Sequence, residues 1–208
     1  MLHSYIYDKL ILDIFPNESI YSFLQKEWVI PIILGAAIPL LLSIVGLLLF
    51  FIQTGIRAFL AYTIGESTMV FLCDYLTAPG VVFHELSHLF MCIITRAKIL
   101  SFRLYHPSSD GTLGTVDFAA RGFIISRSLQ YFLISSAPVY FGIAIETVGI
   151  LAFVKGWMLY WWQYALLMYL MICIFFHVHM SSQDLKVFAK GIPLFSLVVI
   201  FVLHTILW

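Results

Sequence analysis

Residues 79–88 read Pro-Gly-Val-Val-Phe-His-Glu-Leu-Ser-His, and the last five of them follow the pattern His-Glu-x-x-His. On a helix, His84 and His88 are about one turn apart, so both imidazoles lie on one face and can share a metal ion. The stretch has apolar flanks, with Val81 to Phe83 before the motif and Leu89 to Ile94 after it. Ionisable side chains are costly in lipid, so their presence in such a helix predicts a functional site within the membrane.

The composition indicates the class of protein. Of the 208 residues, 62% are hydrophobic and only 11% are charged, which is typical of an all-α polytopic membrane protein rather than a soluble domain. The formal net charge of zero gives no indication of nucleic-acid binding. The cysteines Cys73, Cys92 and Cys173 form no Cys-x-x-Cys pair, so they predict neither a disulfide framework nor a thiolate zinc site.

The apolar runs predict about five to six transmembrane helices, with a small β-hairpin directly after the His-Glu-x-x-His helix. On this basis the chain divides into an N-terminal interfacial segment (residues 1–28), an N-terminal transmembrane region (29–78), a core that carries the motif (79–190) and a C-terminal transmembrane segment (191–208). Residues 29–52 are long enough to span a bilayer. Residues 53–77 fit either a further span or a pair of helices packed against the bundle.

Local signals place the motif between two breaks. Pro79 fits the first turn of a helix, because its missing N–H would have no intrahelical partner there, and we expect this helix to run to about Ala97. Residues 98–120 then show two alternating segments around an Asp-Gly turn, which is the pattern of a hairpin. Further on, Pro138 predicts a helix kink that frees a backbone carbonyl.

The distribution of Lys and Arg predicts the orientation. Basic residues occur before the motif, around the hairpin and after the later apolar run: Arg57, Arg96, Lys98, Arg103, Arg121, Arg127, Lys186 and Lys190. Because short cytoplasmic loops carry an excess of such residues, we expect a multi-pass protein with these groups on the cytoplasmic side, which is self-consistent for Arg57 if residues 53–77 contain a span. The motif then lies in the cytoplasmic half of the bilayer.

A catalytic zinc site has three protein ligands and one open position. Glu85 follows the first candidate ligand, where a carboxylate can take a proton from a zinc-bound water. Downstream of the motif, the candidates for a third ligand are Asp110, Asp117, Glu146, Asp184, His177 and His179. The first two are explained by a turn and a strand, whereas Glu146 lies in the middle of a predicted span.

An argument from depth favours Asp184 over Glu146. His88 lies ten residues before Lys98, which places it about 15 Å from that end of the helix. Asp184 would begin the last span from the same side, so the two side chains can meet. The competing explanation is that Asp184 only caps that helix together with Ser181 or Ser182.

At this point the chain resembles the site-2 protease family of intramembrane zinc metalloproteases, over about residues 79–190. The resemblance rests on the motif in a span, the basic hairpin after it and a late Asp after two further spans. It implies one Zn²⁺ per chain held by His84, His88 and Asp184, water activation by Glu85, and a membrane-protein substrate cut in or beside the lipid bilayer. The family's Asn-Pro and Asp-Gly around the third ligand are absent, so the chain resembles a divergent, minimal member.

Two alternative functions remain open from the sequence. One is a gluzincin-type membrane protease with Glu146 as the third ligand, although Ile150 stands where those enzymes carry an Asp. The other is a catalytically silent, metal-binding membrane scaffold. In the leading hypothesis the hairpin receives an unwound substrate as an added strand; an amphipathic surface hairpin with no such role explains the same pattern equally well.

Overall fold

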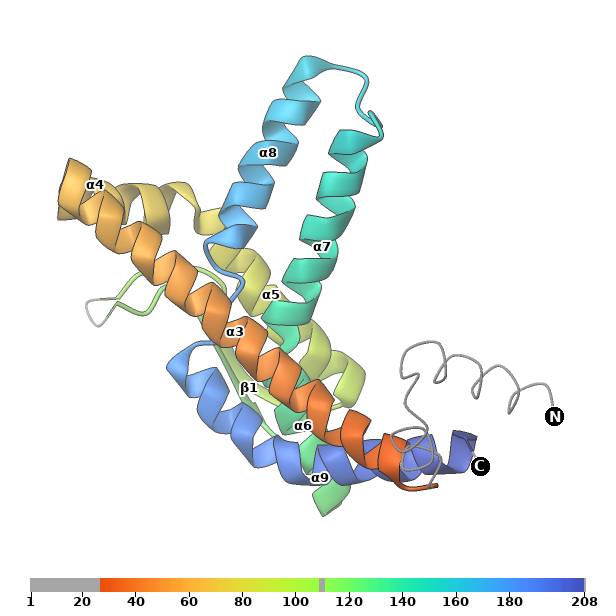
Figure 1. The fold of residues 1–208 in the computed structure, drawn as a ribbon. Helices are drawn as coiled ribbons and strands as arrows, with labels where there is room; N and C mark the ends of the chain where they lie inside the picture. The colour runs from red at the N-terminus through yellow and green to blue at the C-terminus, as the bar shows by residue number, and fades with distance from the viewer. Residues whose placement is uncertain (1–26, 109–110, 208) are drawn as a thin grey trace.

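The structure is a computed structural model that describes residues 27–108 and 111–207, so the predicted interfacial segment lies almost entirely outside the described residues. Figure 1 shows a helical bundle with one small sheet. In chain order, its elements are α3 (Val29–Ile64), α4 (Glu66–Val70), the π-helix η1 (Phe71–Leu76), α5 (Ala78–Thr95), β1 (Lys98–Arg103), β2 (Thr115–Ala119), α6 (Ile124–Ser135), α7 (Ala137–Val154), α8 (Trp161–Phe175) and α9 (Ser182–Leu207).

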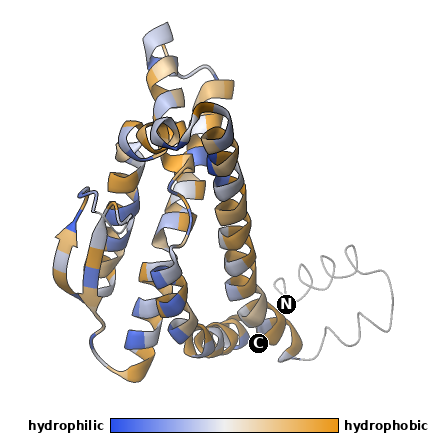
Figure 2. Cartoon of the chain, turned by 90° about the vertical axis from the view of Figure 1, so that its left-hand side faces the viewer, coloured by the Kyte–Doolittle hydropathy of each residue, from blue (hydrophilic) through white to orange (hydrophobic). Residues whose placement is uncertain are grey.

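Four of the described helices, α3, α5, α7 and α9, are long and apolar enough to cross a membrane, and α8 is a shorter apolar helix of 15 residues. Only 11% to 39% of the residues in their apolar windows are buried inside the protein. Large apolar side chains therefore cover the outside of the bundle. Figure 2 shows that residues of high hydropathy make up much of the long helices.

The first long helix settles the ambiguous segment 53–77. Helix α3 runs without a break from Val29 to Ile64, and the short α4 and η1 follow it. The charged Arg57 is tolerated inside this helix because its Nη1 lies 2.7 Å from Asp74 Oδ1. The segment is thus the end of one helix followed by two short ones, and not a separate span.

Helix α5 and the hairpin confirm the predicted local structure. Pro79 lies in the first turn of α5, and the helix ends at Thr95, two residues before the expected position. The two strands pair antiparallel, with Arg103 opposite Thr115 and an irregularity between Ile99 and Ser101. Beyond the paired strands, the backbone N of His106 donates to the carbonyl of Leu113 and that of Ser108 to the carbonyl of Thr112, so the two segments stay together up to the predicted Asp-Gly turn.

The predicted kink is present as a break between two helices. Helix α6 ends at Ser135 and α7 begins at Ala137 with Pro138 in its first turn. Proline has no N–H to give to the residue four positions earlier, which here is Ile134. The carbonyl oxygen of Ile134 therefore lacks the helical donor that residue 138 would otherwise provide.

The last helix begins at Ser182 and runs to Leu207, so Asp184 lies in its first turn, as the depth argument expected. The expected boundary between 190 and 191 therefore falls inside a continuous helix. Its N-terminal half packs tightly on α6: a Cβ on Gly191 would lie 2.6 Å from the backbone N of Phe132, and Ser128 Oγ donates to the Gly191 carbonyl at 2.9 Å. This contact brings the start of α9 beside α5 and the end of α6.

Candidate metal centre

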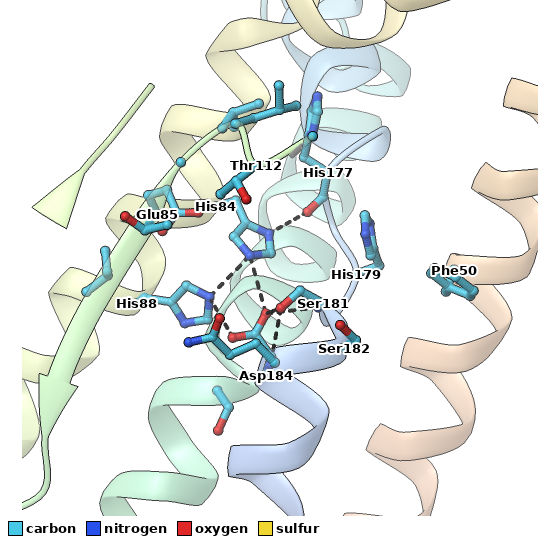
Figure 3. Close-up of a pocket in the computed structure, with 18 of the residues that line it drawn as sticks. Phe50, His84, Glu85, His88, Thr112, His177, His179, Ser181, Ser182 and Asp184 are labelled. Carbon is cyan, nitrogen blue, oxygen red and sulfur yellow. Dashed lines mark hydrogen bonds and ion pairs between the residues drawn. The ribbon is translucent and has the colours of Figure 1, made fainter. Parts of the chain in front are cut away.

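Three of the predicted site residues meet between α5 and α9. His84 Nε2 lies 3.1 Å from His88 Nε2 and 3.7 Å from Asp184 Oδ2, and His88 Nε2 lies 3.4 Å from Asp184 Oδ1. Among the described residues, these three side chains form the group that could hold a metal ion. Figure 3 shows them facing one another, with the strands on one side and α3 on the other.

The spacing of the three donor atoms fits a tetrahedral ion. Zinc bonds to imidazole nitrogen and carboxylate oxygen are about 2.0–2.2 Å long, so neighbouring donors of a tetrahedron lie about 3.3 Å apart. In the site the two Nε2 atoms are 3.1 Å apart, and they lie 3.7 Å (His84) and 3.4 Å (His88) from Oδ2 and Oδ1 of Asp184, respectively, which is around this value. Little rearrangement is needed for the three atoms to bind one ion and leave a fourth position open.

Two backbone carbonyls fix the tautomers of the histidines. His84 Nδ1 lies 2.7 Å from the carbonyl oxygen of His177, and His88 Nδ1 lies 2.7 Å from that of Ile134. A carbonyl only accepts, so both Nδ1 atoms carry the hydrogen, and a neutral ring in this tautomer presents its lone pair at Nε2. These lone pairs face each other across the site, and a shared cation satisfies both of them. Backbone carbonyls commonly orient metal-binding histidines in this way.

The carboxylate of Asp184 is oriented by Ser181, the residue directly before its helix. Ser181 donates to Asp184 Oδ2 from its backbone N at 2.9 Å and from its Oγ at 2.7 Å. The backbone N of Asp184 donates in return to Ser181 Oγ at 3.1 Å. The capping role considered from the sequence is therefore present, and it leaves Oδ1 directed toward His88.

No protein-family model, curated protein or solved structure matches this chain. The chemistry of the site is therefore argued from its own side chains. Its donors are two imidazole nitrogens and one carboxylate oxygen, and zinc and other divalent transition metals accept this set.

Glu85 lines the same cavity as the three candidate ligands, and the cavity has a volume of about 500 Å³. The side chain is 7% exposed and lies under the hairpin, where a Cβ on Gly114 would be 2.7 Å from its Cγ. The cavity is lined on one side by strand β2 and the connection between β1 and β2. On the other side it is lined by α3, including Phe50 and Gln53. Glu85, the predicted general base, therefore lies at the wall of the cavity that the hairpin forms.

The other candidates for the third ligand lie outside the group of three. Glu146 is on α7, with Oε1 buried and no hydrogen-bond partner within the described residues. Asp117 accepts a hydrogen bond from Ser101 across the hairpin at 2.6 Å, and Asp110 falls outside the described residues. The ring of His179 lies 6.3 Å from that of His84, measured between centroids.

His177 and His179 lie in the loop between α8 and α9, outside the candidate spans. Burial is the main cause that lowers the pKa of His177 to about 3 and the pKa of His179 to about 4. Both rings are therefore neutral near pH 7, and each carries a single N–H. In His177 that hydrogen is on Nε2, because Nε2 lies 2.9 Å from the hydroxyl of Thr77, which already donates to Cys73.

Sequence reasoning missed the groups that orient the ligands. One signal was available: Pro138 predicted a free carbonyl, and this carbonyl is the one that His88 uses. No local signal pointed to the carbonyl of His177, because its contact with His84 joins residues 93 positions apart. Ser136, the polar residue between α6 and α7, donates to the carbonyl of Phe132 in α6.

Proposed function

We propose that this chain is a zinc-dependent intramembrane endopeptidase, a divergent and minimal relative of the site-2 proteases. The observation that carries the proposal is the meeting of His84, His88 and Asp184, with Glu85 in the same cavity. The donor set alone also suits iron(II). Glu85 places a carboxylate directly after the first histidine ligand on the same helix. This pattern favours a zinc-dependent hydrolase over an iron(II) site.

The surface of the bundle supports a location in the membrane. Soluble proteins rarely expose large continuous apolar areas, yet most residues in the apolar windows of α3, α5, α7 and α9 face outward. Each of these helices is at least 18 residues long, or about 27 Å at 1.5 Å per residue, close to the thickness of the hydrocarbon core. Helix α8, at about 22 Å, would be a fifth membrane helix that is shorter than the core.

In the proposed hydrolysis, the zinc ion and the side chains of the protein would have different roles. A zinc ion held by His84, His88 and Asp184 would lower the pKa of water and polarise the scissile carbonyl. Glu85 would accept the proton of the attacking water and pass it to the leaving amine. The carbonyls that accept from the two Nδ1 atoms would keep both rings oriented through the reaction.

The free edge of β2 supports a place for the substrate. The sheet has two strands in the order β1-β2, so one edge of β2 has no partner strand among the described residues. Residues 115–118 of this strand line the cavity that holds Glu85. An unwound segment of a membrane protein could pair with this edge and pass its backbone over the site.

The proposed orientation follows the basic residues, which lie around the hairpin and at the start of α9. Lys98 and Arg103 are in β1, and Lys186 and Lys190 are in the N-terminal half of α9. The positive-inside rule then favours the cytoplasmic side for the hairpin. The site would lie in the cytoplasmic half of the bilayer.

The test of this function is cleavage of membrane peptides in lipid vesicles. The full chain, loaded with zinc, is incubated with a library of transmembrane peptides, and the products are identified by mass spectrometry. We expect products from the wild type and none from Glu85→Gln, which has nearly the same shape but no basic carboxylate. Equal cleavage by the zinc-loaded variant would refute the role of Glu85, and intact peptides with both proteins would favour the silent scaffold.

A further inference from the structure

A buried chain of hydrogen bonds leads from the start of α5 to the first metal ligand. The hydroxyl of Thr77 donates to the carbonyl of Cys73 at 2.6 Å, and the same oxygen lies 2.9 Å from His177 Nε2. The hydrogen of a hydroxyl serves one acceptor, so His177 Nε2–H donates to Thr77. The backbone carbonyl of His177 in turn accepts from His84 Nδ1.

The residues that form this series of hydrogen bonds are almost fully shielded from solvent. Cys73 is 1% exposed, Thr77 is 4% exposed and His177 is 7% exposed. A hydrogen bond that is lost in such a place leaves a buried polar group unpaired, which destabilises the folded state. The contacts are therefore strong constraints on the loop that carries the His177 carbonyl.

The same region has no room for movement between α5 and the end of α8. A Cβ on Gly80 would lie 1.9 Å from the carbonyl oxygen of Cys173 and 2.7 Å from His177 Cδ2. Glycine thus allows the two backbones to approach closely, and the hydroxyl of Thr77 fixes the ring of His177 at the point of contact. Together they determine where the His177 carbonyl meets His84.

We propose that Thr77 and His177 are positioning residues, which set the ring orientation and tautomer of His84 for metal binding. The proposal rests on the metal site of the proposed function and does not depend on peptide hydrolysis. His88 is oriented separately, by the carbonyl of Ile134. Loss of the Thr77 hydroxyl should therefore disturb one imidazole ligand and leave the other in place.

The test compares two substitutions at Thr77 with a matched control at Thr95. Thr77→Val keeps the shape and removes the hydroxyl, whereas Thr77→Ser keeps the hydroxyl. Thr95, at the other end of α5, also donates to a carbonyl four residues earlier, at 2.6 Å, and among the described residues no side chain donates to its hydroxyl. Thr95→Val thus removes the same kind of side-chain bond without touching His177.

The readout is the zinc affinity of the full chain in detergent, measured by competition with a chelator, together with the visible absorption of the cobalt(II) form. We expect Thr77→Val to bind zinc about 10- to 100-fold more weakly and to change the cobalt spectrum. Thr77→Ser and Thr95→Val should resemble the wild type. Wild-type affinity in Thr77→Val, or equal losses in all three variants, would overturn the proposal.

A second pair of variants covers the case in which Thr77→Val does not fold. His177→Gln keeps an N–H donor that can reach Thr77, whereas His177→Leu has none; the first should retain zinc and the second should lose affinity. Equal affinity of the two would overturn the proposal. If the wild type itself binds no zinc, the positioning role and the proposed function both fail. If the variants behave as expected but no peptide is ever cut, only the proposed function fails.

Discussion

Replacement of Gly80 by Ala tests how closely α5 and α8 must approach for the metal site to form. A Cβ at this position would lie 1.9 Å from the carbonyl oxygen of Cys173, whereas real Cβ atoms essentially never come closer than 3.0 Å to another heavy atom. The two backbones must therefore separate by at least about an ångström, since a carbonyl cannot rotate away as a side chain can.

This movement should affect both stability and metal binding. Overpacking of this kind costs about 1–3 kcal/mol, and the better helix propensity of alanine returns up to about 1 kcal/mol. The carbonyl of His177 lies four residues beyond Cys173, and its hydrogen bond to His84 is 2.7 Å long. An ångström of displacement takes this bond outside the usual range, so zinc affinity should fall about 10-fold or more.

The assay is zinc affinity by chelator competition and the midpoint of thermal unfolding, both on the full chain in detergent. Gly55→Ala is the matched control. Gly55 also lies inside a helix, α3, and a Cβ at this position would have no atom within 4 Å. We expect the control to unfold at the wild-type temperature or above and to bind zinc normally. Our reasoning is wrong if Gly80→Ala matches the control in both measurements.

Three further predictions concern the other contacts of the site. His84→Ala and His88→Ala should each lose bound zinc, and full zinc by elemental analysis in either variant would contradict the ligand assignment. Ser181→Ala should bind zinc about 10-fold more weakly, because the Ser181 hydroxyl orients the carboxylate of Asp184; unchanged affinity in a chelator titration would argue against this. Pro138→Ala should also weaken zinc binding, since the new N–H can compete for the carbonyl that His88 uses, and wild-type affinity would show that no such competition occurs.

The parts of the structure that follow from local sequence were predictable. The spacing of His84 and His88 places both on one helix face, and Pro79 marks the start of that helix because of its missing N–H. Pro138 predicted a free carbonyl for the same kind of reason. These features depend on residues within one or two helical turns, so no knowledge of the packing was needed.

The parts that depend on distant partners were not predictable. Arg57 made the end of α3 ambiguous, because the sequence does not show that Asp74 lies within 2.7 Å to balance its charge. Lys186 and Lys190 likewise lower the hydropathy of the first turns of α9, which placed the expected domain boundary inside this helix, although Gly191 packs this part tightly on α6. The sequence also left the third ligand open between Asp184, Glu146 and two histidines, because the choice depends on how α9 packs against α5.

The most direct test of the metal centre is a zinc titration of the wild type beside Asp184→Ala and Glu146→Gln. The wild type should bind one zinc ion per chain. Asp184→Ala should bind it more than about 100-fold more weakly, since removing a ligand lowers zinc affinity more than removing a group that only orients a ligand. Glu146→Gln should bind it as the wild type does. Tight zinc binding by Asp184→Ala, together with release by Glu146→Gln, would contradict the account and favour Glu146 as the third ligand.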